Sequence, residues 1–519
     1  MDNAFPDRET VKPGPFGREI ALLTVIILIS SCLSIVSLTR KSVTIDEFAH
    51  LPAGLSYLRL RSFTLYPHSP PLVRMLAALP LWKSQAQLPL GPGWSSGRHW
   101  VMGYDFMDAN AGSYQRLLVR ARLVIVVLGA LIVLLSWWWA RSLYGPPAGA
   151  VAAGLCAFCP NLMAHARLVT TDTGATLGFV AALYAFSRFC KRPGPGAGAL
   201  AGTALALALL TKFTCLLLAP LFGVLGLVYL SEWWSPPNRR RAAAGLSLMV
   251  LCAWLVLNTG YLWQGVGTPL GQYHFHSRAM ARVAGYLPGA LPAPFPYDFL
   301  RGLDLQSMEN EKPYYQYLLG KLSREGWWYF PLVALVVKTP PAALSLMAAG
   351  LISFFAGRGR KMSEEIFLVL PAAVVILVMC FSMKMAPAHR YLLPAYPLLY
   401  IIASRILALD FGKRRWRRHS PRSTGHSARV RRCAWAAARR SRSRLFPRAR
   451  WGSTLPLASG ACRAAGWSRS TGRKAQEKPR WRSRSSPRRR RPVERPPSST
   501  PNMRSTPSMP RSWESIPTT

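Results

Sequence analysis

The sequence predicts an all-α polytopic membrane protein with about ten transmembrane helices, interfacial loops on the outer side and a disordered basic C-terminal tail. Three observations support this prediction. Half of the 519 residues are hydrophobic. Several uncharged runs are about as long as a helix that crosses a hydrocarbon core of roughly 30 Å. Basic residues recur in alternate turns between these runs, which is typical of cytosolic loops.

The first predicted span is Ile20–Leu38. It follows a polar N-terminus, residues 1–19, whose basic residues place it in the cytosol by the positive-inside rule. The run is long and lacks a small-residue cleavage site, so we expect a retained helix and not a signal peptide. The external loop that follows, to about Arg122, contains an apolar segment, Leu72–Trp82, which is too short to span and is predicted to lie at the membrane interface.

Further apolar segments complete the membrane domain, residues 20–410. Eight of them are 123–140, 148–162, 174–189, 196–210, 213–230, 242–263, 366–381 and 391–409. A ninth segment carries Lys338–Pro341 in its outer part and ends before Arg358. This register puts the basic turns at Arg141, Lys191, Arg239 and Arg358 inside. A loop of about 65 residues, rich in proline and tyrosine, then lies outside before the aromatic run 327–330, whose residue types favour the headgroup level.

The tail, residues 411–519, carries most of the excess charge. It holds 30 Lys and Arg against 3 Glu, within a net charge of +44 for the whole chain. It shows no apolar periodicity and cannot bury a core, so we expect disorder. Two interpretations remain open: a frame-shifted translation of a GC-rich gene, which we favour, or an arm that binds RNA or lipid. We expect no nucleic-acid partner for the protein as a whole.

The predicted register brings chemically reactive side chains to one external face. They come from separate loops and comprise Asp46, Glu47, His68, His165, Asp172 and Arg390, with Lys212, Lys338 and Lys384 as further cations. A carboxylate can take a proton from an acceptor hydroxyl, and an interfacial cation can hold an anionic lipid phosphate. Such a set suits transfer of a group from a membrane-borne phosphodiester.

Several alternatives are open for these residues. Asp172 could cap the helix predicted near Gly174. A divalent metal at Asp46, Glu47, His68 or Asp172 is conceivable, although no ligand spacing demands it, so we expect no required cofactor. A non-catalytic transporter or lipid-binding protein could also line a polar path with these carboxylates.

Five motifs in this order resemble a known family. They are 46–54 (DEFAHLPAG), 70–80 (PPLVRMLAALP), 164–172 (AHARLVTTD), 326–340 (GWWYFP followed by KTP) and 390–394 (RYLLP). Together they resemble bacterial lipid-carrier-dependent glycosyltransferases of the GT-C type, similar to protein O-mannosyltransferases and the lipid A aminoarabinose transferase. The likeness covers roughly residues 15–410.

The resemblance implies transfer of a hexose or pentose, with inversion, from a polyprenyl-phosphate donor to a lipid, glycan or protein acceptor. The reaction would take place at the periplasmic or extracytoplasmic face of the inner membrane. By this likeness Asp46 is the acceptor-activating base, Glu47 helps to place the acceptor, and Asp172 is the second acidic residue. His68, His165, Lys338 and Arg390 are expected to bind substrate. The chain has His68-Ser69 where relatives carry a charged residue before the paired prolines.

Overall fold

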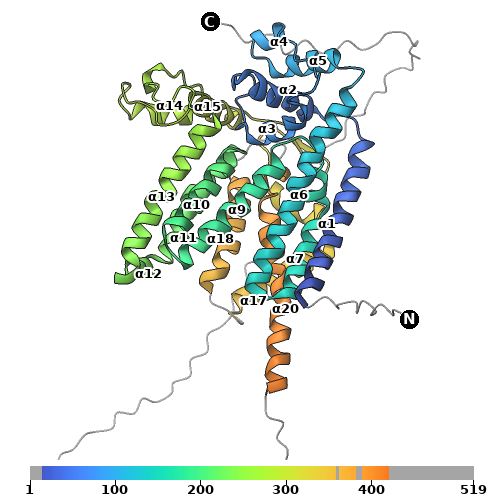
Figure 1. The fold of residues 1–519 in the computed structure, drawn as a ribbon, viewed down its shortest axis with the longest axis vertical. Helices are drawn as coiled ribbons and strands as arrows, with labels where there is room; N and C mark the ends of the chain where they lie inside the picture. The colour runs from blue at the N-terminus through green and yellow to red at the C-terminus, as the bar shows by residue number, and fades with distance from the viewer. Residues whose placement is uncertain (1–14, 358–361, 382–387, 420–519) are drawn as a thin grey trace, which may run out of the picture. The chain divides into compact units, whose positions relative to one another are not determined.

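The computed structural model describes residues 15–357, 362–381 and 388–419, which lie in one compact unit, Met1–Ser423. Lys384 and nearly all of the predicted tail lie outside the described residues. The described part is mostly helical, as the sequence predicts (Figure 1). A short antiparallel hairpin, β1 (Gln316–Leu318) with β2 (Lys321–Ser323), is the exception to the all-α prediction within these residues.

Apolar helices form the bundle of the structure (Figure 1). Each predicted span coincides with a helix of this bundle: α1 (Pro15–Thr39), α6 (Tyr114–Tyr144), α7 (Pro146–Ala157), α9 (Asp172–Lys191), α10 (Pro195–Leu209), α11 (Leu218–Leu227), α13 (Pro236–Gly260), α17 (Pro341–Phe355), α18 (Met362–Phe381) and α20 (Ala395–His419). Among the described residues, α1, α6, α13 and α18 are long and apolar enough to cross a membrane alone. The count of ten crossings stays a prediction.

The segment expected to be one span around Lys338 is instead sharply bent. Helix α16 (Phe330–Lys338) meets α17 at 117°. Thr339 between them has an extended backbone with ψ of 131°. The two prolines that follow explain the break, because proline lacks an N–H and disfavours helical geometry in the residue before it. Because of this bend, the C-terminal end of α16, at Lys338, is free to contact neighbouring elements such as α8.

A second layer covers one end of the bundle, called here the loop end (Figure 1). It contains α2 (Ile45–Leu60), α3 (Leu72–Ala78) with the 3₁₀ turn η1 (Leu79–Leu81), α4 (Pro92–Ser95), α5 (His99–Ala109), α14 (Arg278–Gly285) and α15 (Tyr297–Glu311). The predicted interfacial helix is therefore present as α3 and η1. The remaining short elements are α8 (Pro160–His165), η2 (Phe213–Leu217), α12 (Leu230–Trp234), η3 (Leu270–Gln272) and α19 (Ala388–Tyr391). Of these, α12 lies at the other end of the bundle, between α11 and α13 (Figure 1).

Glycines allow α10 and α13 to pack with their backbones in contact. A Cβ added at Gly198 would lie 2.0 Å from the carbonyl oxygen of Gly245, and one at Gly202 would lie 2.1 Å from that of Met249. Small residues four apart are the usual device for such close approach between helices in membranes. Because α10 ends directly before Lys212, this packing also fixes the position of that lysine.

Replacing Gly202 with leucine should separate α10 from α13 and lower stability. The backbone atoms that a side chain would meet cannot move aside cheaply, so we expect a cost of about 1–3 kcal/mol or more. The measurement is the thermal midpoint of the purified protein in detergent. Gly223→Leu is the matched control, because nothing lies within 4 Å of a Cβ built there. Equal midpoints for the two variants would contradict the packing argument.

Candidate active site

The adjacent carboxylates Asp46 and Glu47 lie in the first turn of α2 and have different surroundings. Thr44 precedes this turn with an extended backbone and is the N-cap of the helix. The Glu47 side chain reaches back and accepts a hydrogen bond from the Thr44 N–H at 2.9 Å, which completes a capping interaction. This contact fixes the start of α2, and therefore the position of Asp46 one residue earlier.

Glu47 is fully buried and its carboxylate is saturated. Arg122, on α6, donates to it from Nε at 2.8 Å and from Nη2 at 2.6 Å, and both side chains are inaccessible to solvent. The backbone N–H of Val169 donates to Oε1 at 2.9 Å, and Thr44 also donates its hydroxyl. With its acceptor positions occupied, Glu47 has the geometry of a positioning residue. Direct contact with an acceptor would require breaking one of these bonds.

Asp46 remains partly accessible. Its Oδ2 accepts a hydrogen bond from Nη1 of Arg390 at 2.5 Å, and the two side chains are 24% and 27% exposed. Arg390 lies on α19, at the opposite end of the sequence. The Nε of this arginine is buried and has no hydrogen-bond partner among the described residues. Asp46 is thus paired with Arg390, and the Nε of that arginine remains available as a hydrogen-bond donor.

Asp172 forms the second such pair at the start of α9. Its Oδ1 accepts from Nζ of Lys212 at 2.5 Å, and Nδ1 of His165 lies 3.6 Å from Oδ2. Burial alone would raise the pKa of Asp172, but Lys212 and then Arg390 lower it well below its usual range. Burial is the main cause that lowers the pKa of His165, and nearby cations lower it further. At neutral pH the site therefore holds a carboxylate and an uncharged imidazole.

The aromatic ring of Tyr391 joins the two pairs. Nζ of Lys212 lies 3.9 Å from the ring centroid, and the guanidinium carbon of Arg390 lies 5.7 Å from it. Both cations are therefore within reach of a cation–π interaction with one ring. The contacts form a continuous path from Asp46 to Asp172, so the structure brings these two predicted residues together.

A buried polar network places the remaining cation, Lys338. Asn161 donates from Nδ2 to the Lys338 carbonyl at 2.9 Å, and its Oδ1 lies 2.8 Å from Nε2 of His389. The hydroxyl of Tyr396 accepts a second bond from the same amide nitrogen at 3.1 Å. Asn161 thus connects α8, which carries His165, with the chain on either side of Arg390 and with the bend after α16. The side chain of Lys338 is exposed.

Two larger cavities lie near Lys212. An apolar groove of about 530 Å³ lies between α3, α6, α9 and α10, and Gly174 and Thr211 are among its lining residues. A second cavity, of about 300 Å³, is lined by Lys212 and Tyr391, by His68 and by one face of α15. The groove suits a hydrocarbon chain, and the second cavity combines polar and apolar walls.

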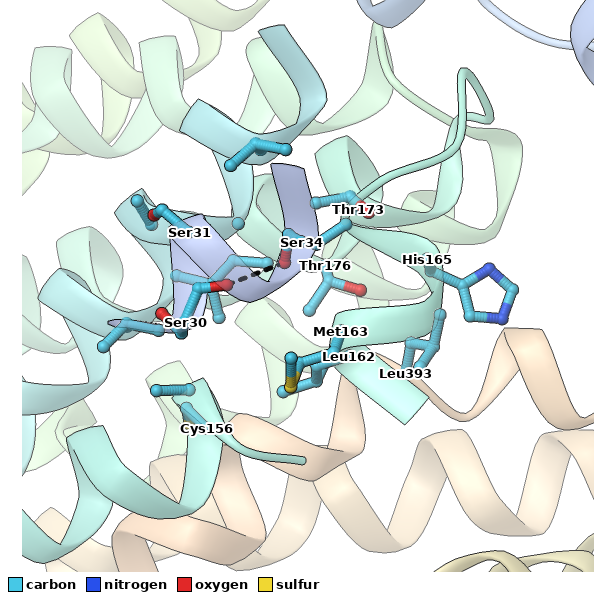
Figure 2. Close-up of a pocket in the computed structure, with 17 residues that line it drawn as sticks. Ser30, Ser31, Ser34, Cys156, Leu162, Met163, His165, Thr173, Thr176 and Leu393 are labelled. Carbon is cyan, nitrogen blue, oxygen red and sulfur yellow. Dashed lines mark hydrogen bonds between the residues drawn. The ribbon is translucent and has the colours of Figure 1, made fainter. Parts of the chain in front are cut away.

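A small cavity of about 30 Å³ lies beneath the site, between α1 and the chain from α6 to α9. It has room for about one water molecule. Serines of α1, among them Ser30 and Ser34, and the hydroxyls of Thr173 and Thr176 line it. Figure 2 shows His165 at its edge with the imidazole directed away from these serines. The orientation is consistent with the proximity of that ring to Asp172.

His68 lies in a cluster of aromatic and imidazole rings. The ring of His99 stacks on Tyr66 with centroids 4.1 Å apart, and His68 lies 5.4 Å from His99. Burial lowers the pKa of His68 to about 4 and that of His99 to about 3, with the buried Arg74 contributing to both. His68 is therefore uncharged at neutral pH.

The carboxylates of the site are engaged by cations and not grouped as metal ligands. No set of three His, Cys, Asp or Glu side chains in the described part of the chain could hold a metal ion. Glu47 is saturated by Arg122, Thr44 and Val169, and Asp172 is bonded to Lys212. A metal would need to displace these partners.

Arg122, Tyr391 and Asn161 are site residues that were not predicted from the sequence. Arg122 was placed at the end of a loop, whereas α6 begins at Tyr114 and carries it inside the helix. An arginine within an apolar helix needs a buried partner, so the position of Arg122 beside an apolar run was the sequence feature that indicated a buried ion pair. Lys212 was noted only as a further cation, because its partner Asp172 is forty residues away in the sequence.

Comparisons with known proteins agree with the resemblance read from the motifs. Residues 116–258, from α6 to α13, match the family described as dolichyl-phosphate-mannose-protein mannosyltransferase. This match confirms, for that segment, the predicted similarity to membrane glycosyltransferases that use a lipid carrier. A comparison with curated proteins found no match.

Two proteins of known structure are among those that the chain matches. ArnT from Cupriavidus metallidurans, bound to undecaprenyl phosphate, is 16% identical with a TM-score of 0.47, over 76% of this chain and 61% of that one. The archaeal oligosaccharyltransferase AglB from Archaeoglobus fulgidus, with an inhibitory peptide and a dolichol-phosphate, is 15% identical with a TM-score of 0.48, over 81% and 54%. The chain thus spans at most about three fifths of the length of these proteins.

Glu47→Gln should destabilise the protein far more than Asp46→Asn. The first change leaves Arg122 buried without a charge partner, which typically costs about 3–5 kcal/mol. The second breaks a partly exposed pair, typically worth about 0–1 kcal/mol. Thermal midpoints in detergent measure the difference, and the double variant Glu47→Gln/Arg122→Gln should recover part of the loss. A Glu47→Gln protein as stable as the parent would exclude the positioning role.

Acidification should destabilise the protein through His68 and His99. Their pKa values are lowered on folding, so the unfolded chain binds protons first, and stability present above about pH 6.5 is lost as the pH falls towards about 4. Each group contributes about 1.4 kcal/mol per pH unit in this window. The thermal midpoint measured from pH 7.5 to 5 should fall less for His99→Phe than for the parent.

The exposed His274, changed to glutamine, provides the control for this experiment. It lies outside the ring cluster, so its pH profile should match that of the parent. A His99→Phe profile as steep as the parental one would show that His99 is not a source of the acid sensitivity.

Proposed function

We propose that the protein is a membrane glycosyltransferase that moves a sugar from a polyprenyl-phosphate donor to a hydroxyl group of a lipid, glycan or protein acceptor. The observation that carries this proposal is the pair of carboxylates, Asp46 and Asp172, each joined to a cation, with both cations against the ring of Tyr391. The arrangement provides both a proton acceptor and cationic partners for a phosphate. The matching family is itself described by a lipid-phosphate sugar.

In the proposed reaction the acceptor oxygen attacks the anomeric carbon of the sugar. The bond from that carbon to the phosphate oxygen breaks, and the electron pair leaves with the polyprenyl phosphate. Asp46 takes the proton of the acceptor hydroxyl through Oδ1, the oxygen that Arg390 does not bind. A single displacement of this kind inverts the anomeric configuration. Charge on the leaving phosphate is met by cations that are already in place.

The balance of charge at the site supports phosphate binding. Lys212, Arg390 and Lys338 all lie near enough to lower the pKa of His165. Asp46 and Asp172 are the carboxylates paired with two of them, which leaves one positive charge to match a phosphodiester. The buried, unpartnered Nε of Arg390 is a donor for a phosphate oxygen.

The apolar groove is the proposed site of the donor's hydrocarbon chain. Its lining includes Thr211, the residue before Lys212, so a chain lying in it could bring its phosphate to the cations. We expect no required metal, since the carboxylates are engaged by cations. The proposed location is the inner membrane with ten crossings, and the positive-inside rule puts the loop end on the periplasmic or extracytoplasmic side.

Asp46→Asn should abolish sugar transfer and leave the amount of folded protein unchanged. The amide cannot take the acceptor proton, so the rate should fall by at least about a hundredfold, the usual effect of removing general base catalysis. The measurement is transfer of label from a radiolabelled polyprenyl-phosphate sugar in membranes that contain the protein. Transfer by Asp46→Asn at the parental rate would remove Asp46 from the mechanism.

Asp105→Asn is the control for this assay, since Asp105 lies on α5 with its carboxylate beside Gly93 and belongs to neither of the two ion pairs. It should transfer at the parental rate. EDTA added to the parental protein should leave the rate unchanged. A parent that moves a lipid-linked sugar across the membrane without joining it to an acceptor would favour the transporter alternative.

A further inference from the structure

One face of α15 forms a wall of the 300 Å³ cavity. Leu303, Gln306, Ser307 and Asn310 line it, and their spacing of three and four residues places them on one stripe of the helix. A flank of α15 outside this stripe is used for folding: Asp304 accepts the backbone N–H groups of His276 and Ser277, both at 2.8 Å. The polar side chains of α15 that face the cavity are therefore not needed to hold the loop that contains His276 and Ser277.

These side chains keep hydrogen-bonding capacity towards the cavity. Gln306 donates from Nε2 to Oδ1 of Asn310 at 3.3 Å, and Ser307 donates to the Leu303 carbonyl at 2.7 Å. The amide oxygen of Gln306 and the amide nitrogen of Asn310 remain for a ligand. Neutral donors and acceptors of this kind suit sugar hydroxyl groups.

Lys212 is the one charged side chain among the described residues that line this cavity. The nearest carboxylates are occupied elsewhere: Asp172 is bonded to Lys212 itself, and Glu309 accepts from Lys312 at 2.7 Å and from the Tyr314 hydroxyl. A sugar that carries an ammonium group would find no carboxylate among the described residues that line the cavity, and the ammonium of Lys212 would lie in the same wall. The walls therefore suit an uncharged sugar.

The position of α15 is set by a close backbone contact. A Cβ added at Gly302 would lie 2.2 Å from the carbonyl oxygen of Pro67, the residue before His68. This contact holds the α15 face opposite Lys212 and Tyr391 at a fixed distance. The cavity is thus built between two loops and the cationic end of the bundle.

Resting on the proposed function, we infer that the α15 face, through Gln306 and Asn310, recognises the donor sugar and selects an uncharged sugar over an amino sugar. The lipid phosphate lies at Lys212, and the sugar occupies the cavity beyond it. Gln306 and Asn310 are specificity-determining residues in this assignment, and neither takes part in bond breaking.

The test is a binding measurement on the full-length protein in nanodiscs, which needs no turnover. A fluorescent polyprenyl phosphate is displaced by polyprenyl phosphate, by polyprenyl-phosphate hexose, or by a polyprenyl-phosphate 4-amino sugar. The parent should bind the hexose donor about tenfold more tightly than the amino donor. Gln306→Ala and Asn310→Ala should each weaken hexose donor binding by about three- to tenfold and leave polyprenyl phosphate unaffected.

Two further variants sharpen the result. Met308→Ala, on the same helix but not in the cavity wall, should bind all three ligands as the parent does. Asn310→Asp places a carboxylate in the wall and should shift the preference towards the amino donor by about tenfold. Recovery of amino-donor binding by Asn310→Asp would be hard to explain by a purely structural role.

The outcomes separate this inference from the function on which it rests. Equal weakening of polyprenyl phosphate and hexose donor by Asn310→Ala would overturn the sugar assignment, as would a parental preference for the amino donor. Failure of polyprenyl phosphate itself to bind would overturn both proposals. Sugar-dependent binding without transfer to any acceptor would uphold the cavity assignment and count against the transferase.

Discussion

The buried ion pair between Glu47 and Arg122 is the constraint on which the site depends. Two adjacent carboxylates begin α2, and the pair determines which of them is available. Arg122 also donates to the carbonyls of Leu38 and Lys41, so the end of α1, the start of α2 and the middle of α6 meet at one guanidinium. With Glu47 fixed inward, the helix can present only Asp46 at the accessible end.

The other two carboxylates of the site, the partly exposed Asp46 and the buried Asp172, are held in another way. Asp46 and Asp172 each pair with a cation, and the desolvation of such pairs makes them weak sources of stability. Their occurrence around one aromatic ring is therefore better explained by chemistry than by folding. Preorganised charges of both signs avoid reorganisation when a phosphate leaves, which is the main advantage of an enzyme site over water.

Much of the bundle could be predicted from the sequence because apolar length is a direct requirement of the bilayer. The segments around Leu123 and Ile366 became α6 and α18 with shifts at their ends. The bend at Thr339 was missed, although two prolines marked it, because the surrounding residues remain apolar on both sides. The hairpin 316–323 has no strong alternation of polar and apolar residues, so it could not be predicted from the sequence either.

The site was harder to predict for a different reason. Single residues such as Asp46 and Asp172 stood out as charges near apolar runs, but the sequence does not show which cation each one meets. The partner of Asp46 is 344 positions away, and that of Glu47 is 75. Which carboxylate is buried follows from tertiary packing alone, so Asp46 and Glu47 look equivalent until Arg122 is placed in the helix.

Asn161 has a consequence for the spacing of positive charge. Its amide nitrogen donates to the Lys338 carbonyl, and its amide oxygen bonds the imidazole of His389, next to Arg390. One rigid planar group therefore connects two cationic segments. Because the amide group is planar and rigid, these hydrogen bonds set how far apart the two segments lie. A ligand that enters this end of the bundle therefore meets two cationic segments whose spacing is already set.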